Sequence, residues 1–289
     1  MKSVQLYFLF IFVLPLVFSP SAEAVRCSNL FVDLQLTEFP LVIGGRRTNE
    51  RYLTAAFERF VADMDLAQVH AVLGFIRDNG VSGLTREQRK IVIRFRQNTS
   101  FMRSIIQTST DRHRRPRRFG EFVRDFGILK DLILAGDGTR ARRMAEDILR
   151  NYEINERMML SDFSPANRRS MRRYFRELMN DTQTLMSRTN MTVDDIHSVR
   201  KNLRNVLRFL QIQATVDYAR QHENPQGSPP DTPQIAYLKN LDAQLGRICD
   251  ENAGRILSGS LTEDSPMRFP ENLRTLVERF LQNYQIIEG

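Results

Sequence analysis

Residues 193–222 read VDDIHSVRKNLRNVLRFLQIQATVDYARQH and carry the clearest helical pattern in the chain. Their apolar side chains recur three and four positions apart, which is the spacing of one face of an α-helix. The members of this apolar face are Ile196, Val199, Leu203, Val206, Leu207 and Leu210. A helix with one such face buries it against neighbouring elements. The stretch therefore predicts a long amphipathic helix that helps to form a helical core.

A basic stripe lies beside this apolar face. His197, Arg200, Arg204 and Arg208 are spaced at i, i+3, i+7 and i+11, and Lys201 lies near their edge. Positive charges stacked along one helix face repel each other, and that face of the helix carries no acid. A negatively charged ligand that follows the stripe would remove the repulsion, and His197 could donate a hydrogen bond to it. The alternative interpretation is an ordinary solvent-exposed face.

Helical periodicity extends over most of the chain, and alternation typical of strands is nearly absent. Thr85 is a predicted N-cap, Gly80 and Gly136 are predicted helix ends, and the proline-rich stretch 224–233 is a predicted loop. The predicted helices cover about 49–65, 69–79, 85–108, 119–135, 139–160, 166–187, 193–222, 234–258 and 270–285. The fold class that follows is all-α.

The first 24 residues have the features of a secretory signal peptide. Lys2 precedes an apolar run from Leu6 to Phe18, and Ala22-Glu23-Ala24 matches an A-x-A cleavage site. The run is shorter than the roughly 20 residues that span a bilayer, and no second run of that length follows. We therefore expect an exported, periplasmic or secreted protein without a transmembrane segment. The alternative is a buried N-terminal helix. Residues 25–48 are predicted to form an extended N-terminal segment.

Arginine dominates the basic residues. The chain has 42 Lys and Arg against 34 Asp and Glu, a net charge of +8. After residue 24 the only lysines are Lys90, Lys130, Lys201 and Lys239. A guanidinium group binds two phosphate oxygens at once, whereas an ammonium group is a compact point charge. The bias favours a phosphate-rich ligand, although a GC-rich genome would also raise the arginine content.

Two cysteines remain after the predicted cleavage, Cys27 and Cys249. Exported proteins fold under oxidising conditions, so this pair is a predicted disulfide. Closing so long a loop would stabilise the fold by roughly 4–5 kcal/mol in the chain-entropy description. Two free thiols are the alternative. Cysteines this far from other metal ligands do not predict a metal site.

Two pairs of segments repeat within the chain. Residues 86–96 align with 197–207, and residues 119–131 align with 238–250, in the same order. In the second pair Gly127 matches Gly246, and Asp131 matches Asp250. The repeat predicts two related helical halves, residues 49–165 and 166–289.

These repeated segments resemble the CHAD domain (conserved histidine α-helical domain) family. That family carries a helix reading H-x-x-R-x-x-x-[RK], which His197, Arg200 and Arg204 match. A later helix reads roughly L-G-x-x-x-D, which residues 245–250 match, and the first half has a similar Gly127 to Asp131. The first half departs from the pattern because Arg86 replaces the histidine. In the second half Asn205 and Leu207 stand at usually basic positions.

The resemblance covers about residues 49–285 and implies two four-helix bundles related by pseudo-twofold symmetry around a basic channel. It also implies that the protein binds inorganic polyphosphate. We expect no cofactor, no metal and no catalytic residues. The predicted polyanion-binding residues are His197, Arg200, Lys201, Arg204, Arg208, Arg86, Arg89, Lys90, Arg94 and Arg96. A secondary basic cluster is predicted at Arg168, Arg169, Arg172, Arg173 and Arg176.

Other functions fit less of the sequence. The basic segment Arg112-His113-Arg114-Arg115-Pro116-Arg117-Arg118 is predicted to be a mobile loop that attracts anions or contacts nucleic acid. A non-specific nucleic-acid or anionic-surface binder is therefore the main alternative. For the segment itself, the alternative is a solvated linker without a binding role. A phosphate-ester hydrolase fits less well, because the sequence has no P-loop, no nucleophile elbow and no clustered metal ligands.

Overall fold

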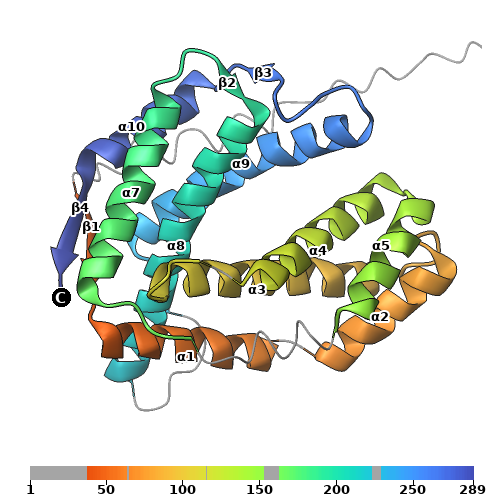
Figure 1. Ribbon diagram of the computed structural model, residues 1–289, viewed down its shortest axis with the longest axis horizontal. Helices are drawn as coiled ribbons and strands as arrows, with labels where there is room; N and C mark the ends of the chain where they lie inside the picture. Colours follow the sequence, from red (N-terminus) through yellow and green to blue (C-terminus); the bar gives the residue numbers. More distant parts are fainter. Residues whose placement is uncertain (1–37, 64, 115, 153–162, 223–228) are drawn as a thin grey trace, which may run out of the picture. The chain divides into compact units, whose positions relative to one another are not determined.

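The computed structural model describes residues 38–63, 65–114, 116–152, 163–222 and 229–289. These residues belong to one unit spanning 36–289. The predicted signal peptide and Cys27 lie outside the described ranges. The helices within them are α1 (Arg46–Asp63), α2 (Leu66–Asn79), α3 (Arg86–Ser109), α4 (Arg117–Ala135), α5 (Gly138–Arg150), α7 (Arg168–Met186), α8 (Val193–Gln221), α9 (Pro233–Leu257) and α10 (Glu271–Asn283) (Figure 1). The prediction of a mostly helical chain is confirmed.

Helix ends follow local capping chemistry. The hydroxyl oxygen of Thr85 accepts a hydrogen bond from the backbone N–H of Gln88, and the Gln88 side chain accepts one from the N–H of Thr85. This reciprocal arrangement satisfies two N–H groups that a helix start would otherwise leave unpaired. Gly136 ends α4 with φ of 73°, a conformation that glycine adopts without strain. The predicted cap at Thr85 and the predicted end at Gly136 are both confirmed.

The N-terminal boundary differs from the prediction. Helix α1 begins at Arg46, three residues before the predicted start at residue 49. Asn49 is fully buried, and its side-chain amide donates to the carbonyl oxygens of Ala166 and Gly44 at 2.8 and 3.3 Å. This buried amide holds the start of α1 against the chain that leads into α7, a contact between segments far apart in the sequence.

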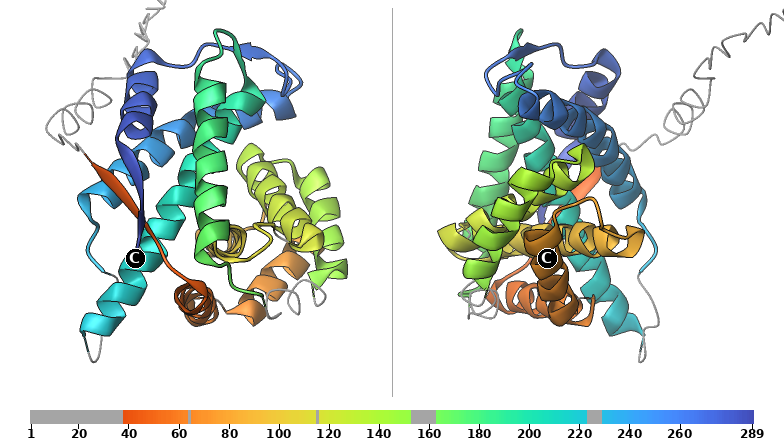
Figure 2. Two further views of the ribbon diagram at one scale, coloured as in Figure 1. Left: turned by 60° about the vertical axis from the view of Figure 1, so that its left-hand side comes forward. Right: turned by 90° about the vertical axis from the view of Figure 1, so that its right-hand side faces the viewer.

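The helices pack in two series that follow the chain. In the first series α2, α3, α4 and α5 pack in succession, and α5 returns to contact α2. In the second series α7, α8, α9 and α10 pack in the same order, and α10 returns to contact α7. Helices α3 and α8 join the two series, while α1 packs against both of these helices (Figures 1 and 2).

Aromatic rings fill the centre of each series. Phe95 of α3 lies with its ring centroid 4.5 Å from that of Phe126 on α4. In the second series Phe175 of α7 lies 4.8 Å from Phe209 of α8, and all four rings are inaccessible to solvent. Burying a phenylalanine side chain stabilises a fold by about 1.5–3 kcal/mol. The apolar face predicted from residues 193–222 therefore belongs to the core.

Two small sheets tie distant segments together. Strand β1 (Phe39–Ile43) pairs in parallel with β4 (Tyr284–Glu288), and β2 (Met191–Thr192) pairs antiparallel with β3 (Pro266–Met267). The predicted last helix to residue 285 is wrong at its end, because α10 stops at Asn283 and the chain becomes β4. Within the described ranges, none of the helices combines the length and apolar character that crossing a bilayer requires.

Candidate functional site

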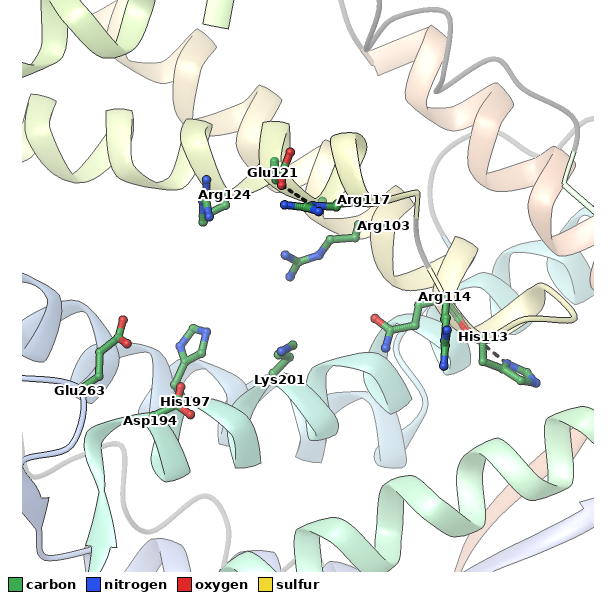
Figure 3. Close-up of a pocket in the computed structure, with 12 residues that line it drawn as sticks. Arg103, His113, Arg114, Arg117, Glu121, Arg124, Asp194, His197, Lys201 and Glu263 are labelled. Atoms are coloured by element: carbon green, nitrogen blue, oxygen red, sulfur yellow. Dashed lines mark hydrogen bonds and ion pairs between the residues drawn. The ribbon is translucent and has the colours of Figure 1, made fainter. Parts of the chain in front are cut away.

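A cleft of about 660 Å³ opens between α8 on one side and α3 with α4 on the other (Figure 3). The side chains that line it come from α3, the loop after α3, α4, the start of α8 and the loop before β3. They are Arg103, Gln107, His113, Arg114, Arg117, Gly120, Glu121, Arg124, Asp194, His197, Lys201 and Glu263. A concave site of this size, with several convergent polar groups, is a candidate ligand site.

Helical geometry presents these residues to the cleft in rows. Asp194, His197 and Lys201 are spaced three and four residues apart, so they share one face of α8. Arg117 and Arg124 are seven residues apart and share the facing side of α4. The two rows face each other across the cleft, as the labelled side chains in Figure 3 show.

The cleft lining is predominantly basic. Five of its side chains are Arg or Lys and three are Asp or Glu. One of the three carboxylates is already neutralised, because Nε of Arg117 lies 2.9 Å from Oε1 of Glu121. Arg124 pairs at 3.3 Å with Asp125, which does not line the cleft. The balance of charge in the cleft attracts anions.

His197 is a neutral imidazole in this setting. Loss of water around the ring, followed by the charges of Lys201, Arg204 and Arg200, lowers the pKa of His197 to about 4. Asp194 opposes this shift with its negative charge. The ring remains accessible from the cleft (Figure 3). At neutral pH one ring nitrogen is therefore a hydrogen-bond donor and the other an acceptor.

The rest of the predicted stripe has an internal counterion. Nε of Arg200 lies 3.1 Å from Oδ1 of Asp242 on α9, and Nε of Arg204 lies 3.0 Å from the same oxygen. The repulsion along the stripe is relieved in part by this carboxylate, which comes from a different helix and was not predicted. Only His197 and Lys201 of the five stripe residues line the cleft.

Arg208 lies away from the cleft. Its guanidinium group stacks 5.4 Å from the ring centroid of Phe101, which Arg59 approaches at 4.8 Å. Its Nη1 donates to Gln211 at 2.8 Å, and its buried Nε has no hydrogen-bond partner among the described residues. Burial and then the charge of Arg204 lower the pKa of Arg208 to about 10. This position makes Arg208 part of the packing between α1, α3 and α8.

Two arginines pack over glycines that the repeat aligned. A methyl group added at Gly246 would lie 2.6 Å from Nη2 of Arg200, and one at Gly127 would lie 3.8 Å from Nε of Arg96. Glycine is needed at Gly246 because the guanidinium group occupies the space of a side chain. Lys130, three residues after Gly127, pairs with Asp131 at 2.9 Å and with Asp250 at 3.3 Å, which links α4 to α9.

The predicted residues of the first half do not join the cleft. Arg86, Lys90 and Arg94 are exposed and Arg89 is half-buried, and none of them is among its lining residues. Lys90 pairs instead with Glu87 at 2.7 Å on its own helix. Arg96 faces Gly127 in the interior, where burial and then the charges of Arg204 and Arg200 lower its pKa.

The predicted secondary cluster also faces elsewhere. Arg168 and Arg172 of α7 contact the C-terminal strand, where both pair with Glu288. Arg168 also donates to the carbonyl oxygen of Gly289. Arg169, Arg173 and Arg176 are exposed on α7 and do not line the cleft.

The loop predicted to be mobile is anchored at His113. Nδ1 of this ring lies 3.2 Å from the carbonyl oxygen of Gln107, and Nε2 lies 2.6 Å from Oγ of Ser170. A carbonyl only accepts, so Nδ1 carries the proton and Nε2 accepts from the Ser170 hydroxyl. The ring also stacks on Tyr174, 4.6 Å between centroids. His113 has φ of 47°, a left-handed conformation that this tertiary anchor holds in place.

Sequence reasoning missed several residues of the cleft. Arg103 and Gln107 lie about two and three turns beyond the segment of α3 that the repeat singled out, and Arg124 lies within the repeated segment 119–131 at a position that the repeat does not match. Their spacing places Arg117, Glu121 and Arg124 on one face, which was the only signal available. Nothing in the local sequence connects Glu263 to the start of α8.

Cys249 lies beside the interior charges. Burial raises the pKa of its thiol, although a hydrogen bond from Arg200 and its positive charge act in the opposite direction. Cys27 lies outside the described residues, so its pairing with Cys249 stays a prediction. Among the described residues, no three His, Cys, Asp or Glu side chains gather as a metal site would need.

Comparisons with models of protein families, with curated proteins and with solved structures find no match to this chain.

Proposed function

We propose that the cleft between α8 and the α3–α4 pair binds a linear polyanion, with inorganic polyphosphate as the best-fitting ligand. The observation that carries this proposal is the basic excess among the side chains that line a concave site. Four of the five basic groups are arginines, whose planar forks match pairs of phosphate oxygens. The neutral imidazole of His197 supplies a further donor to a phosphate oxygen.

The chemistry of the lining favours phosphates over bases. None of the described residues that line the cleft is Phe, Tyr or Trp. Proteins that bind single-stranded nucleic acids combine a basic groove with aromatic rings on which the bases stack. A cleft without such rings would gain affinity from the phosphate backbone alone. Nucleic acid is therefore a competing ligand in the test rather than the preferred one.

We also propose that the two series of helices are related halves, as in the family that the repeat resembles. The support is their shared order of packing, from α2 to α5 and from α7 to α10. Gly127 and Gly246, which the repeat aligns, both lie beneath an arginine from the preceding helix. Arg86 in place of the family's histidine weakens this resemblance in the first half, and the proposed binding site does not depend on it.

Salt-titrated binding to polyphosphate tests the proposed function. Each neutralised phosphate releases counterions, so the logarithm of the association constant should fall linearly with the logarithm of the salt concentration. Arg103→Ala with Lys201→Ala should weaken binding by about tenfold or more, because two charge-assisted contacts are lost. The matched control is Lys90→Ala with Arg94→Ala, which removes two exposed bases outside the cleft.

Two outcomes would overturn the proposal. Equal losses of affinity in the two double variants would mean that binding follows net charge and not the cleft. Displacement of polyphosphate by single-stranded DNA of equal charge, at equal concentration, would favour a general nucleic-acid binder. Retained folding of each variant is checked by its helical circular dichroism and its urea unfolding curve.

A further inference from the structure

The two ends of the cleft differ in charge. Arg114 lies at one end, and Asp194 and Glu263 lie at the other, where Arg124 of α4 is on the opposite wall (Figure 3). His197 lies next to the acidic end, while Lys201 and Arg103 lie between the two ends. Among the described residues, neither Asp194 nor Glu263 forms an ion pair, and both line the cleft.

The acidic end is built from two distant segments. The backbone N–H of Asp194 donates to the carbonyl oxygen of Glu263 at 3.1 Å, and the N–H of Val193 donates to that of Ser265 at 3.2 Å. The pairing of β2 with β3 continues this contact. The backbones that carry the two carboxylates are therefore held together at the start of α8.

From this polarity we infer that the cleft receives the end of a linear polyphosphate chain and stops it at Asp194 and Glu263. The inference rests on the proposed function, because it concerns how the same ligand lies in the same site. An uninterrupted run of phosphates through the cleft would place an anionic group beside each of two carboxylates. Two like unit charges about 4 Å apart repel each other by about 1 kcal/mol in water and by more near a protein surface. A ligand that ends before the two carboxylates avoids this repulsion and is favoured.

A terminal phosphate also differs chemically from an interior one. It resembles a phosphate monoester, whose second ionisation has a pKa of about 6, so at about pH 6 half of the terminal groups carry a hydroxyl. A P–OH group can donate a hydrogen bond to a carboxylate or to the acceptor nitrogen of His197. An interior phosphate, bonded to two bridging oxygens, has no such hydroxyl at this pH. The acidic end can thus accept a hydrogen bond from a protonated chain terminus, whereas it repels a continuing chain.

Binding to chains with free and blocked ends tests this inference. The ligands are linear polyphosphates of increasing length and a linear polyphosphate esterified at both ends, with equal total charge. Binding is measured at about pH 6, where half of the free ends carry a hydroxyl. At about 0.15 M salt, where the screening length is about 8 Å, remote phosphates contribute little. Every linear chain has two ends whatever its length. We therefore expect the affinity per chain to rise with chain length only until the chain fills the cleft. The blocked chain should bind at least about tenfold more weakly.

A variant of the acidic end separates the inference from the function. Asp194→Asn with Glu263→Gln should strengthen binding of the blocked chain about tenfold and bring it close to the free chain. Asp264→Asn is the matched control, since it removes a charge from the same loop outside the cleft and should leave the ratio unchanged. If wild-type protein binds free and blocked chains equally, and the variant leaves their ratio unchanged, the inference is wrong while polyanion binding stands. If no linear chain binds, the proposed function fails as well.

Discussion

Arg204 and Asp242 form a forked ion pair across the contact between α8 and α9. Nε and Nη2 of Arg204 lie 3.0 and 2.9 Å from Oδ1 of Asp242. Nε of Arg200 lies 3.1 Å from the same oxygen, so one carboxylate serves two guanidinium groups. All three side chains are at least four-fifths buried. Asp242 is therefore the counterion that allows two arginines to lie inside the helical core.

Asp242→Asn should lower the free energy of unfolding by about 3 kcal/mol, because it leaves two buried cations without their shared anion. Urea unfolding followed by circular dichroism measures this loss. Asp231→Asn is the control, since Asp231 pairs with Lys239 at an exposed site where an ion pair contributes at most about 1 kcal/mol. Equal effects of the two substitutions would contradict a structural role for Asp242.

Acid should weaken the same pair. Burial alone would raise the pKa of Asp242, but the charges of Arg204 and Arg200 and their hydrogen bonds outweigh it, and the pKa is lowered. A carboxylate whose pKa is lowered in the folded state stabilises the fold above the unfolded pKa of about 3.9. This stabilisation is lost as pH falls from that value through the folded pKa. The difference in stability between wild type and Asp242→Asn should therefore shrink as pH falls below about 4.

Gly246→Ala should destabilise the protein by about 1–2 kcal/mol, although alanine is the better helix former. The added methyl group would lie 2.6 Å from Nη2 of Arg200 and would displace that guanidinium from Asp242. Gly254→Ala is the matched control on the same helix, where a methyl group meets no atom within 4 Å. That control should raise the free energy of unfolding by up to about 1 kcal/mol. A gain in stability at both positions would show that Arg200 moves freely.

His197 should make the fold less stable as the solution becomes moderately acidic. The folded-state pKa of about 4 lies below the unfolded value of about 6.5. The unfolded chain therefore binds more protons in this window, and stability falls as pH decreases from about 6.5 towards 4. His197→Gln should remove part of this dependence in urea unfolding at stepped pH. His222→Gln, at the exposed end of α8, should leave this pH dependence intact. If the unfolding free energy of His197→Gln falls with pH as steeply as that of the wild type, His197 is not its source.

Ser170→Ala should lower the free energy of unfolding by about 1–2 kcal/mol, because it deprives the half-buried Nε2 of His113 of its donor. The comparison is Thr184→Ala on the same helix, which removes an exposed hydroxyl bonded to its own helix backbone. Hydrogen exchange of residues 110–114 should accelerate in Ser170→Ala and not in the control. Unchanged exchange would mean that the ring stack on Tyr174 anchors this loop without the hydroxyl.

Local sequence determined most of the helices in the described ranges. These helices depend on signals that act within a few residues of one another, so the sequence alone predicts them. Such signals are the apolar spacing along 193–222, the cap at Thr85 and the glycine at Gly136. The amphipathic helix α8 and its buried face follow from that pattern. Strand β4 was missed because it forms only through parallel pairing with β1, more than 240 residues earlier.

Tertiary structure alone decided which charges face a ligand. The sequence predicts one stripe that contains His197, Arg200, Lys201, Arg204 and Arg208. In the structure Arg200 and Arg204 pair with Asp242 of α9, and Arg208 stacks on Phe101 of α3. The other basic residues of the cleft come from α3, α4 and the loop between them. A helix face is defined by a repeat of a few residues. The partner of each charge depends on how helices from distant segments cross, which no local pattern encodes.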